Sequence, residues 1–99
     1  MRIVWTTPAI SDLEAVREYI ARDSEYYATR FVQRLVGAVE VLRGFPELGA
    51  VVPEFEEYGI RERLLGNYRI LYQVRVEDVL VLAIVHARRD LDSLELEHE

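Results

Sequence analysis

The chain has 99 residues and a formal net charge of −6, and 51% of its residues are hydrophobic, which is enough for one small core. It has no cysteine, which excludes a disulfide framework and a thiolate metal site. No apolar run is long enough to span a bilayer, and the first residues lack a signal-peptide pattern. We therefore expect a single cytoplasmic domain with no membrane contact, no cofactor and no metal ion.

The charges are distributed unevenly along the chain. All twelve basic residues are arginines. Residues 59–89 hold six of them against three acids, whereas residues 90–99 hold five acids and no base. We expect one folded domain over residues 1–89 and an acidic tail over residues 90–99. Because arginine carries a permanent charge on a planar fork of donors, the basic segment is suited to bind phosphate or carboxylate.

The first half of the chain predicts a strand and two helices. Residues 2–6 are β-branched or aromatic, which is typical of a strand. Thr7-Pro8 follows, an N-cap residue and a proline suited to the first helical turn. Apolar residues then recur at helical spacing over residues 8–22 and, after the break at Asp23-Ser24, to about Arg43. So short a connection predicts an antiparallel helix hairpin.

The second half predicts an antiparallel β-meander, because from Tyr58 the apolar period changes to two. The three predicted strands span residues 58–65, 68–76 and 79–86. Gly66-Asn67 and Glu77-Asp78 supply the turns, and the N-terminal strand can join the sheet as a fourth member. The predicted fold class is therefore α+β, with the helix hairpin packed on one face of the sheet.

The register of the last two strands determines which side chains meet. If Glu77-Asp78 is a two-residue turn, Val76 pairs with Val79, and Arg69 lies directly opposite His86. One sheet face is then uniformly apolar and should receive the helices. The other face carries Arg69 and His86 beside an apolar stripe formed by Leu71, Leu80, Leu82 and Ile84.

The placement of Arg61 and Arg63 depends on the Gly66-Asn67 turn. A two-residue turn would put both arginines on the core side, where they could not remain unpaired. We therefore expect an odd-length loop that brings them to the second face with Arg69, His86 and the arginines at 88 and 89.

This second face has two interpretations. It can be an ordinary solvated face, with the many aromatic residues read as core packing. Alternatively, several arginines around one imidazole suit a phosphodiester, because the arginines stabilise developing charge while the imidazole moves protons. The apolar stripe favours a functional face, because soluble monomers rarely expose a contiguous apolar patch. Either the tail or a partner should therefore cover it.

The order of these motifs resembles the RelE/ParE family of bacterial type II toxins, of the plasmid-stabilisation type. The most specific part is Tyr68-Arg69-Ile70-Leu71-Tyr72 followed by Val85-His86-x-Arg88, and the helix hairpin and the loop at residues 45–49 add to it. The resemblance covers essentially residues 1–90. It implies a growth-inhibiting toxin that a cognate antitoxin, encoded beside it, neutralises by wrapping a segment over the apolar stripe.

The family divides into two activities, and the resemblance assigns residues to the first of them. RelE-like toxins cleave mRNA in the ribosomal A site, without a metal. Their cations are matched by Arg61, Arg63, Arg69 and Arg88. Where they use a tyrosine six positions further on, this chain has Leu94, and His86 would have to replace it as acid or base.

ParE-like toxins instead poison DNA gyrase and have no known hydrolytic chemistry. The ending His86, Arg88, Asp90 also resembles some toxins of this type. A third reading is an inactive relative that serves as an antitoxin-binding or corepressor subunit. The sequence leaves open which of these holds, and whether the chain forms a homodimer.

Overall fold

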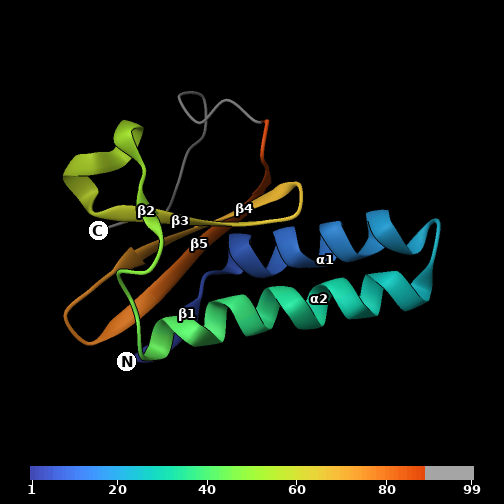
Figure 1. The fold of residues 1–99 in the computed structure, drawn as a ribbon, viewed down its shortest axis with the longest axis horizontal. Helices are drawn as coiled ribbons and strands as arrows, with labels where there is room; N and C mark the ends of the chain where they lie inside the picture. Colours follow the sequence, from blue (N-terminus) through green and yellow to red (C-terminus); the bar gives the residue numbers. More distant parts are fainter. Residues whose placement is uncertain (89–99) are drawn as a thin grey trace.

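The structure, a computed structural model, describes residues 1–88 and contains a helix hairpin and a five-stranded sheet (Figure 1). In chain order the elements are β1 (Arg2–Trp5), α1 (Thr7–Ala21), α2 (Glu25–Glu40), η1 (Val41–Arg43), β2 (Ala50–Val51), η2 (Pro53–Tyr58), β3 (Ile60–Leu65), β4 (Tyr68–Val74) and β5 (Asp78–His86). The strand order is β1-β5-β4-β3-β2, and β1 runs parallel to β5 while the other pairs are antiparallel. The predicted α+β class is confirmed.

Side-chain caps define where the two helices begin. The Thr6 hydroxyl accepts a hydrogen bond from the Ala9 amide (3.1 Å), so Thr6 is the N-cap and α1 begins one residue earlier than predicted. The same hydroxyl donates to the Val81 carbonyl (2.9 Å) and so ties the helix start to β5. Ser24 caps α2 by accepting from the Tyr27 amide (3.2 Å), as predicted.

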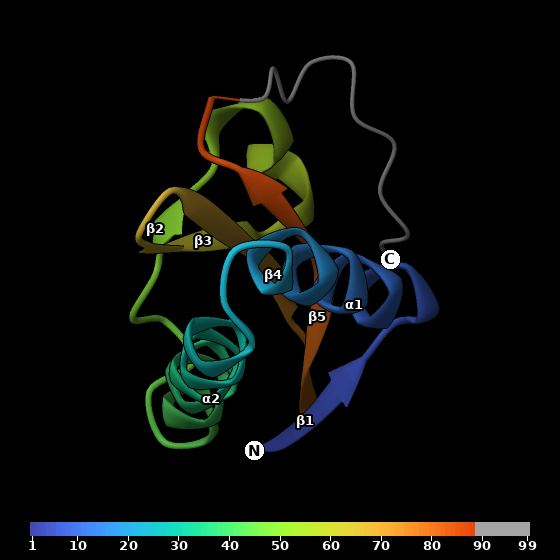
Figure 2. The same ribbon diagram turned by 90° about the vertical axis from the view of Figure 1, so that its right-hand side faces the viewer.

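The helix hairpin covers one face of the sheet. Figure 2 shows α1 and α2 nearly end-on, with β1 beside β5. Both helices bury an apolar stripe against β4 and β5. The buried residues of this cluster are Ala9, Val16, Leu35, Val39, Ile70, Val81 and Ile84. Leu42, Tyr72 and Val79 continue the same layer toward the end of α2.

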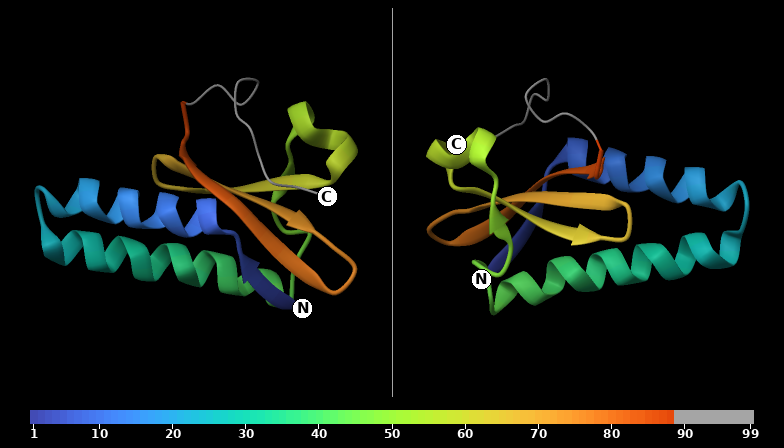
Figure 3. Two further views of the ribbon diagram at one scale, coloured as in Figure 1. Left: turned by 180° about the vertical axis from the view of Figure 1, so that it is seen from behind. Right: turned by 45° about the horizontal axis from the view of Figure 1, so that its top comes forward.

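The opposite face of the sheet is covered by a segment in which the sequence predicted no element. β2 is the edge strand beside β3, and η2, which follows it, lies on the side away from the helices (Figure 3). They contribute Val52 and Phe55 to a second apolar cluster. Its other buried members are Ile60, Leu71, Leu80, Leu82, Ala83 and Val85. Apolar side chains on both faces explain why β4 and β5 are almost continuously hydrophobic.

Both predicted turns differ from the observed ones. The turn at Gly66-Asn67 has two residues, because Leu65 pairs with Tyr68, so the predicted odd-length loop is wrong. Gly66 has a positive φ of 57°, a conformation that glycine adopts without steric cost.

The second turn lies one residue earlier than predicted. Asp78 belongs to β5 and its carbonyl accepts from the Arg75 amide (2.8 Å), so Val74 pairs with Val79 and the predicted pairing of Val76 with Val79 is wrong. The cause is an ion pair across the turn, in which the Asp78 carboxylate accepts from the Arg75 guanidinium (2.5 and 2.7 Å).

A β-bulge changes the register again between Leu71 and Tyr72. Leu71 pairs with Ala83 but Tyr72 pairs with Val81, so Leu82 is an extra residue in β5. Beyond the bulge, the side chains of β5 alternate in the opposite sense from the predicted one.

Candidate functional site

The structure places Arg61 and Arg63 on the helix side of the sheet, opposite Tyr72 and Ile70, and not on the predicted second face. Arg61 donates to the carbonyls of Glu47 (3.2 Å) and Gly49 (2.8 Å). Arg63 donates to the Ala38 carbonyl in α2 (2.8 Å). The expectation that arginines could not remain here unpaired holds, but the conclusion that they must lie on the second face was wrong, because backbone carbonyls that only the tertiary fold brings close supply the partners.

Arg69 lies on the opposite face and is paired. Its partner across the sheet is Val85, so the predicted pairing with His86 is wrong. Its guanidinium donates to the Glu62 carboxylate of β3, through Nε at 3.0 Å and through a second, shorter contact. Only 17% of the Arg69 side chain and 18% of the Glu62 side chain are exposed. The Arg69 guanidinium, which was predicted to bind phosphate, is therefore already bound to Glu62.

His86 and Arg88 lie at the end of β5. His86 is paired with Tyr68, and its Nδ1 accepts a hydrogen bond from the Arg88 amide (3.2 Å). Both residues are exposed. Arg89, Asp90 and Leu94 lie outside the described residues. Of the arginines that the structure describes, Arg61 and Arg63 thus lie on one face and Arg69 lies on the other, so they do not converge on His86.

The predicted apolar stripe is not exposed. Leu71, Leu80 and Leu82 are buried under Val52 of the β2–η2 segment. Ile84 is buried as well, but on the helix side, because the bulge at Leu82 reverses the alternation. The prediction of one exposed stripe containing all four residues is therefore wrong.

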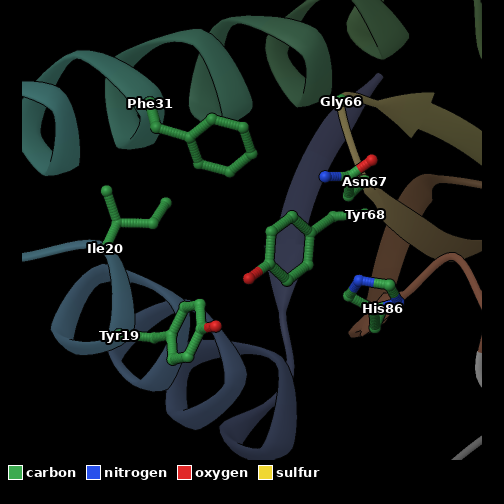
Figure 4. Close-up of a pocket in the computed structure, with 7 residues that line it drawn as sticks. All are labelled: Tyr19, Ile20, Phe31, Gly66, Asn67, Tyr68 and His86. Carbon is green, nitrogen blue, oxygen red and sulfur yellow. The ribbon is translucent and has the colours of Figure 1, made fainter. Parts of the chain in front are cut away.

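A cavity opens between the helix hairpin and the end of the sheet, where the sequence indicated only core packing. Its volume is about 510 Å³, within the range of ligand pockets. The residues that line it are Tyr19, Ile20, Phe31, Gly66, Asn67, Tyr68 and His86. In Figure 4 the Tyr68 ring lies between Phe31, Tyr19 and His86. The interpretation of these aromatics as core packing was correct only in part, because Phe31 and Tyr68 are half-buried and Tyr19 is 62% exposed.

The rings of this cavity are in contact with one another. The centroid of Tyr68 is 5.7 Å from that of His86, edge-on, and 5.5 Å from that of Phe31. Burial raises the pKa of Tyr68, and the neighbouring Tyr19 hydroxyl raises it further. Tyr68 therefore stays a neutral donor and acceptor at physiological pH.

A second tyrosine fixes the loop that follows η1. The buried Tyr72 hydroxyl accepts from the Gly49 amide (2.8 Å). Burial raises the pKa of Tyr72, and the Gly49 hydrogen bond and the nearby Arg61 charge oppose that rise. Together with Arg61, this contact holds a loop whose tip exposes Phe45 and Leu48.

Residues 1–88 contain neither a cluster of metal ligands nor a membrane-spanning helix. In this range no three acidic, histidine or cysteine side chains come together as metal ligands. In the same range no helix has the length and apolar character needed to cross a membrane.

The fold defines a class of protein. An N-terminal strand, a helix hairpin and an antiparallel meander whose last strand pairs in parallel with the first is the architecture of the RelE/ParE-like toxins. The solved ParDE toxin–antitoxin system of P. aeruginosa matches with a TM-score of 0.73 and 24% identity, over 89% of this chain and 97% of the other. The RelBE2 toxin–antitoxin complex of Mycobacterium tuberculosis matches with a TM-score of 0.62 and 24% identity, over 86% and 95%.

Sequence comparison then gives the family. Residues 3–91 match the model of the ParE toxin of the type II toxin–antitoxin system parDE. Toxin RelE2 of Caulobacter vibrioides is 35% identical over 89% of this chain and 97% of its own length. Putative toxin Y4kP of Sinorhizobium fredii is 30% identical over 89% and 90%. The chain belongs to the ParE toxin family of type II toxin–antitoxin systems.

Proposed function

We propose that this toxin stops growth by binding a protein target, DNA gyrase, and not by cutting RNA. The observation that supports this is the separation of the arginines. A nuclease site needs its donors within about 3 Å of one phosphate in the transition state. Here Arg61 and Arg63 donate to backbone carbonyls on one face, while Arg69 is paired with Glu62 on the other.

We also propose that a cognate antitoxin neutralises the toxin by covering part of its surface. Both structural matches, the ParDE system and the RelBE2 complex, are toxins with antitoxins. The expected docking face with Leu71, Leu80 and Leu82 lies under the β2–η2 segment. An antitoxin that contacts these leucines would therefore have to displace Val52 and Phe55, whereas one that binds the outer surface of η2 would not.

The second candidate function is ribosome-dependent mRNA cleavage. One relative carries the name RelE2, and His86 and Arg88 are adjacent and exposed. In this alternative His86 would be the acid or base and Arg88 would stabilise the transition state, while Arg69 would have to leave Glu62 to reach the phosphate. Breaking a largely buried ion pair is costly, which makes this function the weaker candidate.

Two assays with purified protein distinguish the two functions. We expect the toxin to inhibit gyrase supercoiling of a relaxed plasmid, and the cognate antitoxin to restore it. We expect no new stops in primer extension on mRNA bound to ribosomes. New stops in the ribosomal A site, with supercoiling unaffected, would refute the proposal.

The reading as an inactive corepressor subunit is tested separately, by expression without antitoxin. The proposal predicts that growth stops within a few generations and resumes when the antitoxin is supplied. Normal growth with abundant folded protein would instead support the corepressor reading.

A further inference from the structure

The region where the last turn of α1 and the middle of α2 face the β3–β4 turn has features of a binding site. We call this region, the cavity of Figure 4 together with its rim, the hairpin-tip pocket. Tyr19 forms one wall of the cavity and is nevertheless 62% exposed. Phe31, Tyr68 and His86 form the other walls, so a guest would be surrounded by four aromatic rings from four different elements.

The rim of the pocket carries two further exposed aromatics, one of which is paired with an arginine. Tyr26 and Tyr27 are 64% and 67% exposed, and Tyr27 lies one helical turn before Phe31. The Arg22 guanidinium lies over the Tyr19 ring, 5.6 Å from its centroid. Arg30 lies over the Tyr26 ring and donates to its hydroxyl (3.2 Å). Tyrosine and arginine are the residue types most enriched at the energetic centres of protein interfaces.

The charge of the pocket indicates what it would bind. Within the described residues, no carboxylate lines the cavity. Arg22 on one side and Arg88 on the other have no ion-pair partner among residues 1–88. Glu25 on the same hairpin is paired with Arg17 (3.0 Å). Glu18 and Asp23, on the same hairpin, have no ion pair among residues 1–88 either, so the three bases Arg22, Arg30 and Arg88 exceed these two acids by one. This small cationic excess beside an apolar cavity complements an acidic segment with an apolar anchor.

We infer that the toxin binds its protein target through the hairpin-tip pocket. The side chain that enters the pocket is an aromatic or long aliphatic one on an acidic segment of that target. The inference rests on the proposed function and names the surface of the toxin that contacts the target. The rings of Tyr68 and Phe31 contact the anchor, and Arg22 and Arg88 contact the flanking carboxylates. Because the rings already contact one another, their side chains lose little conformational entropy when the partner binds.

The test uses the full-length toxin with purified gyrase and purified antitoxin as the two ligands. Tyr19→Ala removes an exposed wall, and Arg22→Glu reverses the charge of the rim. We expect each variant to bind gyrase at least about tenfold more weakly and to inhibit supercoiling correspondingly less. Both residues are exposed, so the thermal midpoint should stay close to that of the wild type.

The control is Val76→Ser in the β4–β5 turn, which lies at the other end of the molecule (Figure 1). Val76 is almost fully exposed, so this change removes a comparable apolar side chain outside the pocket and should leave gyrase binding unchanged. Wild-type gyrase affinity in Tyr19→Ala and Arg22→Glu would overturn the inference while leaving the proposed function intact. Loss of antitoxin affinity alone would overturn it as well, since the pocket would then belong to the antitoxin. If the wild-type toxin does not inhibit gyrase, the proposed function itself fails.

Discussion

At the scale of single residues, three of the five side chains that the sequence marked as catalytic, those of Arg61, Arg63 and Arg69, make contacts within the fold. Arg61 and the Tyr72 hydroxyl both bind the loop at residues 45–49, and Arg63 binds the end of α2. Each contact satisfies a backbone group that is at least partly buried. Their removal should therefore be measured first as a loss of stability and only through it as a loss of toxicity.

The Tyr72→Phe substitution tests this assignment. It removes the acceptor of the Gly49 amide and leaves that amide buried without a partner. We expect the free energy of unfolding to fall by about 1–2 kcal/mol, measured by urea denaturation. Tyr27→Phe, which changes an exposed hydroxyl, should have no measurable effect. Equal stabilities of the two variants would show that the Gly49 contact contributes nothing.

Asp78 gives a prediction of pH dependence. The Arg75 hydrogen bonds lower the pKa of Asp78, and Arg2 adds to the effect. The unfolded chain therefore binds this proton more tightly than the folded one, so the ion pair stabilises the fold above about pH 4 and the contribution is lost as the pH falls through the lowered pKa. Asp78→Asn should be less stable than the wild type at pH 7, and the difference should shrink below pH 4. A difference that is the same at pH 7 and pH 3 would contradict this account.

At the scale of elements, periodicity was sufficient for the helix hairpin and for the three strands of the meander. The ends lie within about two residues of the predicted ones, except that α2 stops at Glu40 and η1 continues to the predicted end at Arg43. Periodicity was not sufficient for register. The turn moved by one residue because Arg75 and Asp78 pair across it, and Leu82 bulges out of the ladder. Neither feature has a local periodic signal, and together they separated Arg69 from His86.

The candidate site, too, could be predicted from the sequence only in part. The sequence correctly placed Arg61, Arg63, Arg69 and His86 on the meander strands, but it wrongly predicted that they share one face. It did not indicate the partners, because the Ala38 and Gly49 carbonyls lie 25 and 12 residues away and approach only in the folded chain. The aromatic cavity was missed because a half-buried ring and a fully buried ring have the same spacing in the sequence.

Gly49 is the position where the loop approaches the sheet most closely. A Cβ here would lie 2.4 Å from the Glu62 carbonyl oxygen and 2.7 Å from the Tyr72 hydroxyl oxygen. We expect Gly49→Ala to lower the free energy of unfolding by about 1–3 kcal/mol, since the clash is with backbone. Gly37→Ala in α2 is the matched control, because open space surrounds it, and it should raise stability by about 0.5–1 kcal/mol. The two substitutions should therefore change the free energy of unfolding in opposite directions, and a Gly49→Ala variant as stable as the wild type would contradict this prediction.

At the scale of the whole molecule, other elements cover both faces of the sheet. The hairpin-tip pocket, at one end of the molecule, therefore remains as the surface proposed to bind a partner. The helices cover one face and the β2–η2 segment covers the other. The exposed tyrosines Tyr19, Tyr26 and Tyr27, and the arginines that lie over two of them, are close to the α1–α2 turn in the chain. A toxin built in this way is suited to hold a partner protein, whereas its arginines are not arranged around a single phosphate.

The most direct test of this account is the amount of covalent gyrase–DNA complex that the purified toxin traps. The wild type is compared with the double variant Glu62→Gln/Arg69→Gln, which removes both charges of the Arg69 pair and allows a neutral hydrogen bond in its place. The account predicts that both proteins trap complex to the same extent, because Arg69 acts in the fold and not in chemistry. Loss of activity in a double variant that is as stable as the wild type, or trapping by neither protein, would contradict it.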